Sequence, residues 1–399
     1  MDSIKLGLKE NWRQFALLVV INAFVGGMVG MERSIFPEFA TTQFGVTSNT
    51  AILSFILAFG LTKAITNYFT GRLSNSFGRK RLLIVGWLLA MPIPFILIHA
   101  PSWNWIVFAN CLLGISQGLS WSSTVIMKID LVGEKQRGLA MGLNEFAGYL
   151  SVGLISYFTG YVVYTYGIFP YPFYIGFVLV FGGFLLTLLT KDTIQFVKKE
   201  SKNSEKPILR SVFVETSLKN KNLSAITQAG LVNNLNDGMI WGLLPIYLSL
   251  LEYKADSIGI IAGIYPMVWG FGQLFTGKAA DIYPKKTMLF LGMLLQAMVI
   301  LLLPSVEDFF LLIGLTTVLG IGTAMVYPTF LAAIAEFTHP EQRAESLGVF
   351  RFWRDFGYAI GALISGVTAD ILGIKAAILL VGALTALSAF VIWQRMSHS

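Results

Sequence analysis

The stretch GRLSNSFGRKRLL, residues 71–83, has four cationic side chains in a chain of 399 residues that is 55% hydrophobic and only 13% charged. A second copy of the pattern, GKAADIYPKKTML, occupies residues 277–289. Most of the sequence between such polar stretches is apolar, in runs close to the ~20 residues that an α-helix needs to cross a bilayer core. The composition therefore predicts a polytopic membrane protein in which the basic stretches are turns between spans.

We expect twelve membrane-spanning helices. The predicted spans are 15–37, 50–70, 82–100, 105–127, 139–163, 171–190, 224–250, 257–277, 287–304, 309–335, 345–370 and 376–394. The termini and loops on one side of these spans carry 23 lysines and arginines, whereas the opposite loops carry only Lys254 and Lys375. Because cytoplasmic loops hold the excess of positive charge, both termini are predicted to be cytoplasmic.

One connector, residues 191–222, is long, polar and basic. We expect it to be a solvated cytoplasmic linker between an N-terminal bundle of six helices (1–190) and a C-terminal bundle of six helices (223–399). Its part 208–219 has the pattern of an amphipathic helix on the membrane surface.

The two basic turns belong to an internal repeat with an offset of 206 residues. The aligned pairs are Gly71 with Gly277, Arg79 with Lys285, Asp130 with Glu336, Arg137 with Arg343, and Gly142 with Gly348. The repeat breaks at Asn75, where the second copy has Asp281. Two repeated bundles are typical of secondary transporters whose halves rock about a central site.

The repeated turns and acidic segments resemble motifs of a known family. The turn after the second span resembles the signature of the major facilitator superfamily, roughly Gly-x-Leu-x-Asp-x-x-Gly-Arg-Lys, and the acidic-x6-Arg segments 130–137 and 336–343 resemble a motif of its sugar porters. The resemblance covers the whole chain. It implies an all-α membrane protein with 12 transmembrane helices in two pseudo-symmetric six-helix bundles, the major facilitator fold. It also implies a secondary active transporter that works by alternating access, with a functional monomer as the family default.

The repeated turns and the acidic-x6-Arg segments are predicted to form a cytoplasmic gate that must break when the site opens inward. Its candidate residues are Gly71, Asn75, Arg79, Asp130, Arg137, Gly277, Asp281, Lys285, Glu336 and Arg343. The alternative is a static role in topology and stability. Because Asn75 replaces a carboxylate, and a neutral hydrogen bond is about half as strong as a charge-assisted one, the gate is expected to be weaker in the N-terminal half.

Ionisable side chains inside spans are costly and are therefore candidates for function. The resemblance implies that the first and seventh spans line the cavity, which makes Glu32 and Asp237 candidates for proton coupling. Arg33 and Arg351 suit an anionic group of a substrate, because guanidinium binds such groups in a bidentate manner.

Two further charges, Lys63 and Asp355, are expected to pair, since the resemblance makes the second and eleventh spans neighbours. Glu145 and Arg351 are counterparts in the repeat. The remaining cavity candidates are Asn22, Trp121, Asn233, Asn236, Trp241 and Tyr265. Small-xxx-small spacings, as in Gly26 with Gly30 and Gly357 with Gly361, predict close helix packing.

Other classes of function lack their signatures. The three histidines lie at span ends or outside spans, Cys111 is the single cysteine, and no HExxH, nucleophile elbow or phosphate-binding loop occurs. We therefore expect no enzyme, no metal and no cofactor. The basic residues lie in short connectors, which excludes a nucleic-acid partner, and the retained intramembrane charges disfavour a non-transporting receptor.

Two kinds of transport remain open. Acidic residues and many aromatic residues favour proton-coupled export of an amphipathic compound or metabolite. The intramembrane arginines favour a uniporter, an exchanger or an uptake carrier for a small organic anion. The expected partners are a small-molecule substrate, protons and membrane lipids, and the compact loops indicate a prokaryotic inner membrane.

Overall fold

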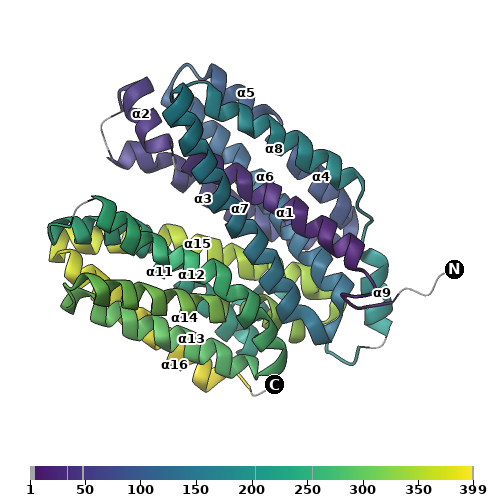
Figure 1. Cartoon of the computed structure of the whole chain (residues 1–399). Helices are drawn as coiled ribbons and strands as arrows, with labels where there is room; N and C mark the ends of the chain where they lie inside the picture. The colour runs from purple at the N-terminus through teal and green to yellow at the C-terminus, as the bar shows by residue number, and fades with distance from the viewer. Residues whose placement is uncertain (1–4, 34, 47–48, 203, 254, 398–399) are drawn as a thin grey trace. The chain divides into compact units, whose positions relative to one another are not determined.

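The computed structural model describes residues 5–33, 35–46, 49–202, 204–253 and 255–397, and every regular element in these ranges is helical (Figure 1). The first half of the sequence forms α1 (Trp12–Arg33), α2 (Phe36–Phe44), α3 (Asn49–Phe77), α4 (Arg79–Ala90), α5 (Pro92–His99), α6 (Trp103–Val132), η1 (Glu134–Gln136), α7 (Arg137–Tyr166), α8 (Tyr171–Leu188) and α9 (Ile194–Lys202). The second half forms α10 (Val212–Val214), η2 (Glu215–Lys219), α11 (Lys221–Leu250), α12 (Ala255–Ile282), α13 (Lys285–Leu302), η3 (Leu303–Ser305), α14 (Phe309–Glu336), α15 (Pro340–Leu372) and α16 (Ile374–Arg395).

Each of the twelve predicted spans coincides with one long helix or with two consecutive helices. The first span is not continuous as predicted, because α1 ends at Arg33 and α2 begins at Phe36, with a proline in its first turn. Proline is accepted there because the first N–H groups of a helix have no partner within that helix. The third span is likewise divided, into α4 and α5, before Pro92.

Within the described residues, eight helical segments are long and apolar enough to cross a membrane by length and composition alone. The predicted spans in α3, α6, α11 and α12 are not among these eight. These four helices carry Lys63, Trp121, Asp237 and Tyr265, which are candidate site residues.

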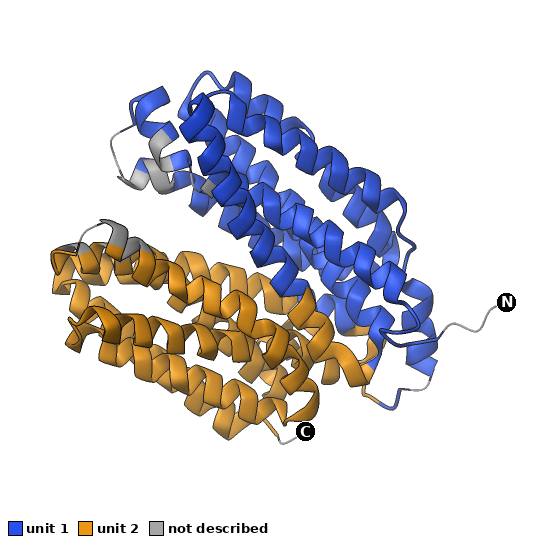
Figure 2. Cartoon of the chain, viewed as in Figure 1, with its two compact units in different colours: residues 1–133, 144–205, 343–348 blue, residues 134–143, 206–342, 349–399 orange. Residues whose placement is uncertain are grey.

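The chain packs as two compact units (Figure 2). Unit 1 comprises residues 1–133, 144–205 and 343–348, and unit 2 comprises residues 134–143, 206–342 and 349–399. Each unit thus includes a short segment from the other half of the sequence. The segment 343–348 lies in α15, and the segment 134–143 contains η1 and the first turns of α7.

Equivalent glycines make equivalent helix contacts in the two units. In unit 1, a Cβ atom on Gly114 of α6 would lie 2.5 Å from the backbone oxygen of Phe59 in α3. In unit 2, a Cβ atom on Gly320 of α14 would lie 2.8 Å from the backbone oxygen of Tyr265 in α12. The glycines, and the residues that they contact, are each separated by the offset of the repeat. The internal repeat is therefore a repeat of packing.

The predicted close packing at small-xxx-small spacings is confirmed. Cβ atoms on Gly26 and Gly30 of α1 would lie closer than 3.0 Å to backbone oxygens of α7 within unit 1. Cβ atoms on Gly357 and Gly361 of α15 would do the same against α11 within unit 2. Glycine thus brings backbones together where any other side chain would separate them.

The linker is more structured than expected. Its first part contains α9, with Thr193 and Val197 buried, so the expectation of a solvated connector is wrong for this part. Its second part is helical at 212–219, which confirms a helix within the predicted range 208–219.

Gly26→Val is expected to destabilise unit 1, because the new side chain would overlap the backbone of α7. Overpacking of this kind costs about 1–3 kcal/mol, measurable as a lower melting temperature of the purified protein. Gly153→Ala, in α7 itself, is the matched control, since a Cβ atom there meets nothing within 4 Å in the described structure. An unchanged melting temperature for Gly26→Val would contradict the close contact.

Candidate functional site

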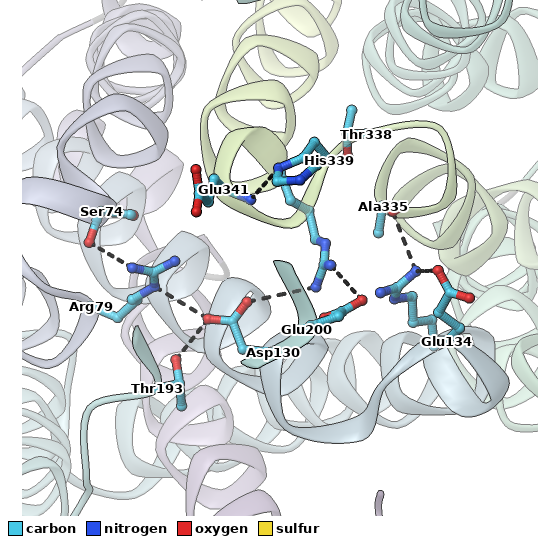
Figure 3. A network of polar contacts seen from close by, with 12 residues as sticks. Ser74, Arg79, Asp130, Glu134, Thr193, Glu200, Ala335, Thr338, His339 and Glu341 are labelled. Atoms are coloured by element: carbon cyan, nitrogen blue, oxygen red, sulfur yellow. Dashed lines mark hydrogen bonds and ion pairs between the residues drawn. The ribbon is translucent and has the colours of Figure 1, made fainter. Parts of the chain in front are cut away.

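A buried polar network surrounds Asp130 at the end of α6 in unit 1 (Figure 3). Arg79 Nε lies 3.2 Å from Asp130 Oδ2, and the Thr193 hydroxyl donates a hydrogen bond of 2.8 Å to the same oxygen. Arg343 Nη1 lies 3.8 Å from Asp130 Oδ1, and its Nη2 lies 2.7 Å from Glu200 Oε1. The network therefore joins α4, α6, the first part of the linker and the start of α15.

The equivalent region of unit 2 is built around a helix cap. Asp281, which follows the predicted span 257–277, accepts hydrogen bonds from the backbone N–H groups of Gly138 (2.6 Å) and Leu139 (2.8 Å). A carboxylate in this position satisfies free N–H groups and favours the positive end of the helix dipole. Burial raises the pKa of Asp281, whereas these two N–H groups and the charges of Lys285 and Arg137 act against that rise.

Unit 2 also contains a counterpart of the Asp130 network. Lys285 Nζ lies 2.6 Å from Glu336 Oε2, with side chains that are 15% and 30% exposed. Arg137 donates a hydrogen bond of 3.3 Å to the backbone oxygen of Ala335 and lies 3.7 Å from Glu134 (Figure 3). In each half, the basic turn thus contacts the acidic motif directly.

The motif glycines allow these contacts. Cβ atoms on Gly71 and Gly277 would lie closer than 3.0 Å to backbone atoms of the segments 344–348 and 138–142, respectively. These helix ends therefore approach their neighbours closely. Asn75, the counterpart of the half-buried Asp281, is exposed.

The sequence missed Thr193 and Glu200 because they lie in a segment that is polar and basic overall. Their only sequence signal is a hydrophobic spacing in residues 194–197, which a short helix needs in order to bury one face.

Deeper in unit 1, polar side chains gather around Glu145 of α7. Trp121 Nε1 donates a hydrogen bond of 3.3 Å to Glu145 Oε1, and Asn144 Nδ2 donates one of 2.6 Å to the same atom. The ammonium of Lys128 donates to Asn144 Oδ1, and Asn22 Nδ2 donates to the backbone oxygen of Asn144 at 2.8 Å. Lys128 lies just beyond the predicted span 105–127, but α6 continues to Val132 and buries this lysine completely.

Lys63 of α3 lies beside this cluster. Its ammonium lies 5.2 Å from the ring centroid of Phe59 and 5.2 Å from that of Trp121. In unit 2, Asp355 Oδ1 lies 2.7 Å from Nη2 of its neighbour Arg354. Because Lys63 and Asp355 belong to different units, their predicted pairing stays a prediction.

Glu32 is almost fully buried in unit 1, where it lines a small cavity with Phe59 and Asn110. The side chain of its neighbour Arg33 lies outside the described residues. Arg351 of α15 is buried.

In unit 2, a row of aromatic side chains leads to Asp237 of α11. The Tyr265 hydroxyl donates a hydrogen bond to Asp237 Oδ1 and lies 3.2 Å from Thr323 Oγ1. The Tyr265 ring lies between Trp241, at 6.5 Å, and Trp269, at 6.0 Å. Trp241 is exposed, whereas Asp237, Tyr265 and Trp269 are buried. The structure thus brings three predicted residues, Asp237, Trp241 and Tyr265, into one site.

Two predicted cavity residues of the same helix have structural partners. Gln296 of α13 donates to Asn233 at 3.0 Å and accepts from Asn236 at 3.1 Å. Thr385 of α16 donates to Asn236 at 2.7 Å. These amides hold α11 against α13 and α16, and their contact with substrate stays a prediction.

The sites of the two units occupy equivalent positions of the repeat. Trp121 corresponds to Tyr327, and Lys63 corresponds to Trp269. In unit 1 the ring of Trp121 lies 5.2 Å from an ammonium. In unit 2 the ring of Tyr327 lies 4.9 Å from that of Trp269 and 5.4 Å from the guanidinium of Arg354. Both counterpart rings thus lie beside a cation, whereas the position of Lys63 itself is occupied by an aromatic residue in unit 2.

Reversal of either charge in the Lys285–Glu336 pair is expected to destabilise the protein, because like charges would then lie about as close as the present 2.6 Å. Lys285→Glu combined with Glu336→Lys should recover part of the loss. Since the pair is partly exposed, we expect a coupling of about 0.2–1 kcal/mol from a double-mutant cycle of unfolding. Lys278→Glu, at an exposed lysine of the same turn, controls for net charge. Additive effects would contradict the pairing.

Comparison with known proteins is consistent with this architecture. The sequence pattern of the Major Facilitator Superfamily matches residues 16–227 and again residues 226–398. The proton-coupled antiporter flippase LtaA of Staphylococcus epidermidis is 26% identical over 384 residues, which cover 92% of this chain and 90% of that protein. LtaA of Staphylococcus saprophyticus is 24% identical over 387 residues, which cover 93% of this chain and 91% of that protein.

Among solved structures, the human organic anion transporter MFSD10 (TETRAN) has the same fold, with a TM-score of 0.77 and 15% sequence identity. The match covers 95% of this chain and 99% of the MFSD10 chain. The predicted fold class is confirmed, as is the assignment to transporters rather than enzymes. The chain belongs to the Major Facilitator Superfamily and is a multi-pass membrane transporter with twelve membrane helices in two pseudo-symmetric six-helix bundles.

Proposed function

We propose that this transporter couples the export of an amphipathic compound to the movement of protons in the opposite direction. Its relatives at 24–26% identity are named proton-coupled antiporter flippases and align over more than nine tenths of this chain. The observation that carries the proposal is the position of two buried carboxyl groups, Glu32 on α1 and Asp237 on α11. A carboxyl group kept at a cost inside a membrane protein is a default candidate for a proton relay.

The surroundings of Asp237 support a proton site. Its contact with Tyr265 is a hydrogen bond from a neutral hydroxyl, which in turn lies beside Thr323. A hydroxyl can donate to a carboxylate and accept from a carboxylic acid, so it can serve both protonation states. Asp355, by contrast, contacts the guanidinium of its neighbour Arg354 at 2.7 Å.

The contacts at the lysine- and arginine-rich helix ends are proposed to form the inner gate. They support this role because the segments 343–348 and 134–143 each pack with the unit of the other sequence half. Opening this end would have to release these segments. The proposal includes cytoplasmic termini, two bundles (1–190 and 223–399) joined by the linker 191–222, and a functional monomer in a prokaryotic inner membrane.

Proton coupling can be tested in liposomes that enclose a pH-sensitive dye, with a panel of amphipaths, organic anions and organic cations added outside. We expect one class to trigger proton movement in the wild type, and Glu32→Gln or Asp237→Asn to abolish it. Asp370→Asn, at an exposed carboxylate of α15, is the matched control and should keep it. Substrate movement without any pH change would overturn proton coupling and favour the alternative, a uniporter, exchanger or uptake carrier for a small organic anion.

The gate can be tested by substitution of its two counterpart residues. Asn75→Asp is expected to close the inner end further, because a carboxylate makes a charge-assisted contact about twice as strong as that of an amide. Asp281→Asn should have the opposite effect. The readout is maleimide labelling of a cysteine in place of buried Ser346, with Cys111 changed to serine. Equal labelling in both variants and the parent would contradict the gate.

A further inference from the structure

Glu145 of α7 is a buried carboxyl group that the proposed function does not use. The residue is 1% exposed. It accepts hydrogen bonds from two neutral donors, the indole N–H of Trp121 and the amide of Asn144, and both end on Oε1. Among the described residues it forms no ion pair. A carboxyl group kept at this depth in a membrane protein is a candidate for function.

The internal repeat shows that the fold does not require polar residues around this carboxyl group. In unit 2 the counterparts of Lys128 and Asn144 are Ile334 and Phe350, and both are buried. The ring of Phe350 lies 5.7 Å from that of Phe330. Apolar side chains therefore satisfy the packing at these positions, and the polar residues of unit 1 need another reason.

Asn144 connects the carboxyl group to a cation. Its Oδ1 accepts a hydrogen bond from the Lys128 ammonium, and its Nδ2 donates to Glu145 Oε1. Because an ammonium can only donate, the orientation of this amide is fixed, and its N–H points to the carboxyl group. An ionised Glu145 makes charge-assisted contacts with Asn144 and Trp121, which are roughly twice as strong as those of a neutral group. Protonation would weaken both contacts.

Glu145 is the only acid among the described neighbours of this cluster in unit 1. Lys128 of α6 reaches the carboxyl group through the amide, and Lys63 of α3 lies 5.2 Å from the indole ring that donates to it. The ring of Tyr149, in α7 itself, lies 5.6 Å from the same indole. From α1, the neutral Asn22 donates to the backbone of α7. A proton that enters this cluster therefore has one carboxyl group to bind.

The cluster lies where α7 passes from one unit to the other. Residues 134–143 belong to unit 2, and the remainder of α7 belongs to unit 1. In unit 2 the start of the helix is held by Asp281, which caps the N–H groups of Gly138 and its neighbour. Glu145 follows Gly138 by seven residues, which is about two turns along the same face. Its contacts thus hold α7 to unit 1 directly after the segment that the proposed gate holds.

We propose that Glu145 is a proton-binding site that controls how firmly α7 is attached at this point. When it is ionised, the carboxylate holds α7 against α6 through charge-assisted hydrogen bonds. When it binds a proton, these contacts weaken, and the first turns of α7 open more readily. The inference rests on the proposed function, because it adds a further proton site to it and connects that site to the gate.

A static role of Glu145 in packing predicts a different behaviour. A glutamine side chain has nearly the same shape and can accept hydrogen bonds from the same two donors, so it would serve packing as well as a carboxylate. Under the proposal, Glu145→Gln instead fixes α7 in the state of the protonated acid. The two roles therefore differ in their dependence on pH.

Proton binding can be measured by infrared difference spectroscopy of the full-length protein in lipid nanodiscs, between neutral and acidic pH. We expect a carboxylic-acid C=O band that appears on acidification in the wild type and is missing in Glu145→Gln. Trp121→Phe removes one donor and keeps an aromatic ring, so the band should remain and change its frequency. Asp370→Asn, at an exposed carboxylate of α15, is the matched control and should keep this band.

The effect on α7 can be measured by maleimide labelling of a cysteine in place of buried Ala140, with Cys111 changed to serine. Labelling rates are divided by those of a cysteine in place of exposed Tyr164 in the same helix, which removes the pH dependence of the thiol itself. We expect this ratio to rise about tenfold on acidification, since a hydrogen bond weakens by about that factor when it loses its charge. Glu145→Gln should show the raised ratio at every pH.

Two results would overturn the proposal: the same infrared band in Glu145→Gln as in the wild type, or an unchanged pH dependence of labelling in that variant. A lower melting temperature of Glu145→Gln without a difference in the band would leave the residue a structural role only. If that variant does not fold, Trp121→Phe decides, because an unchanged band frequency contradicts protonation of a carboxyl group bound to this indole.

Neither measurement uses a proton gradient or a substrate. Failure of proton coupling in liposomes would therefore leave Glu145 standing as a proton-binding site. Failure of the infrared and labelling tests would leave proton coupling standing through Glu32 and Asp237.

Discussion

The arrangement of this protein depends on backbone contacts that only glycine allows. Gly71 lets α3 lie against the segment 344–348, and Gly277 lets α12 lie against the segment 138–142. A side chain at either glycine would separate the helices. Asp281 could then no longer reach the N–H groups at the start of α7. The polar contacts of the proposed gate therefore depend on a steric condition, because Asp281 reaches its partners only where Gly277 lets the helices meet.

Once the backbones meet, the burial of the ion pairs determines how strongly each half is stabilised at this end. Asp130 is surrounded by two arginines and a hydroxyl with almost no exposure, whereas Glu336 meets one lysine at a partly exposed site. Removal of one partner from a buried pair costs about 3–5 kcal/mol, against about 0.2–1 kcal/mol for an exposed pair. The half that lacks the turn carboxylate at Asn75 thus holds the better-buried acid. The two differences act in opposite directions, so the local strength of the gate is not set by Asn75 alone.

Sequence patterns predicted what depends on apolar length, glycine spacing and the repeat. The twelve helical segments and the close contacts of Gly26 and Gly30 are of this kind. Sequence patterns gave wrong or no predictions where contacts with residues distant in the sequence determine the structure. The predicted first span continued through Arg33 to Pro37, although this proline lies in the first turn of a new helix, α2. The predicted fourth span stopped at residue 127, whereas α6 continues to Val132 and includes Lys128. Thr193 contacts an acid 63 positions away, and no local signal encodes that distance.

The internal repeat separates architecture from chemistry within a single chain. Where both halves keep the same residue type at equivalent contacts, as at Gly114 and Gly320, the fold itself explains the residue. Where the halves have the same packing but residues of different charge, the fold explains neither of the two residue types. Lys63 against Trp269 is such a position. It lies beside the Trp121–Glu145 hydrogen bond, and the counterpart of Glu145 in the repeat is Arg351, of opposite charge. A transporter with two equivalent bundles needs an asymmetric cavity in order to orient an asymmetric substrate. Differences of charge at equivalent positions are the means by which this chain can provide one.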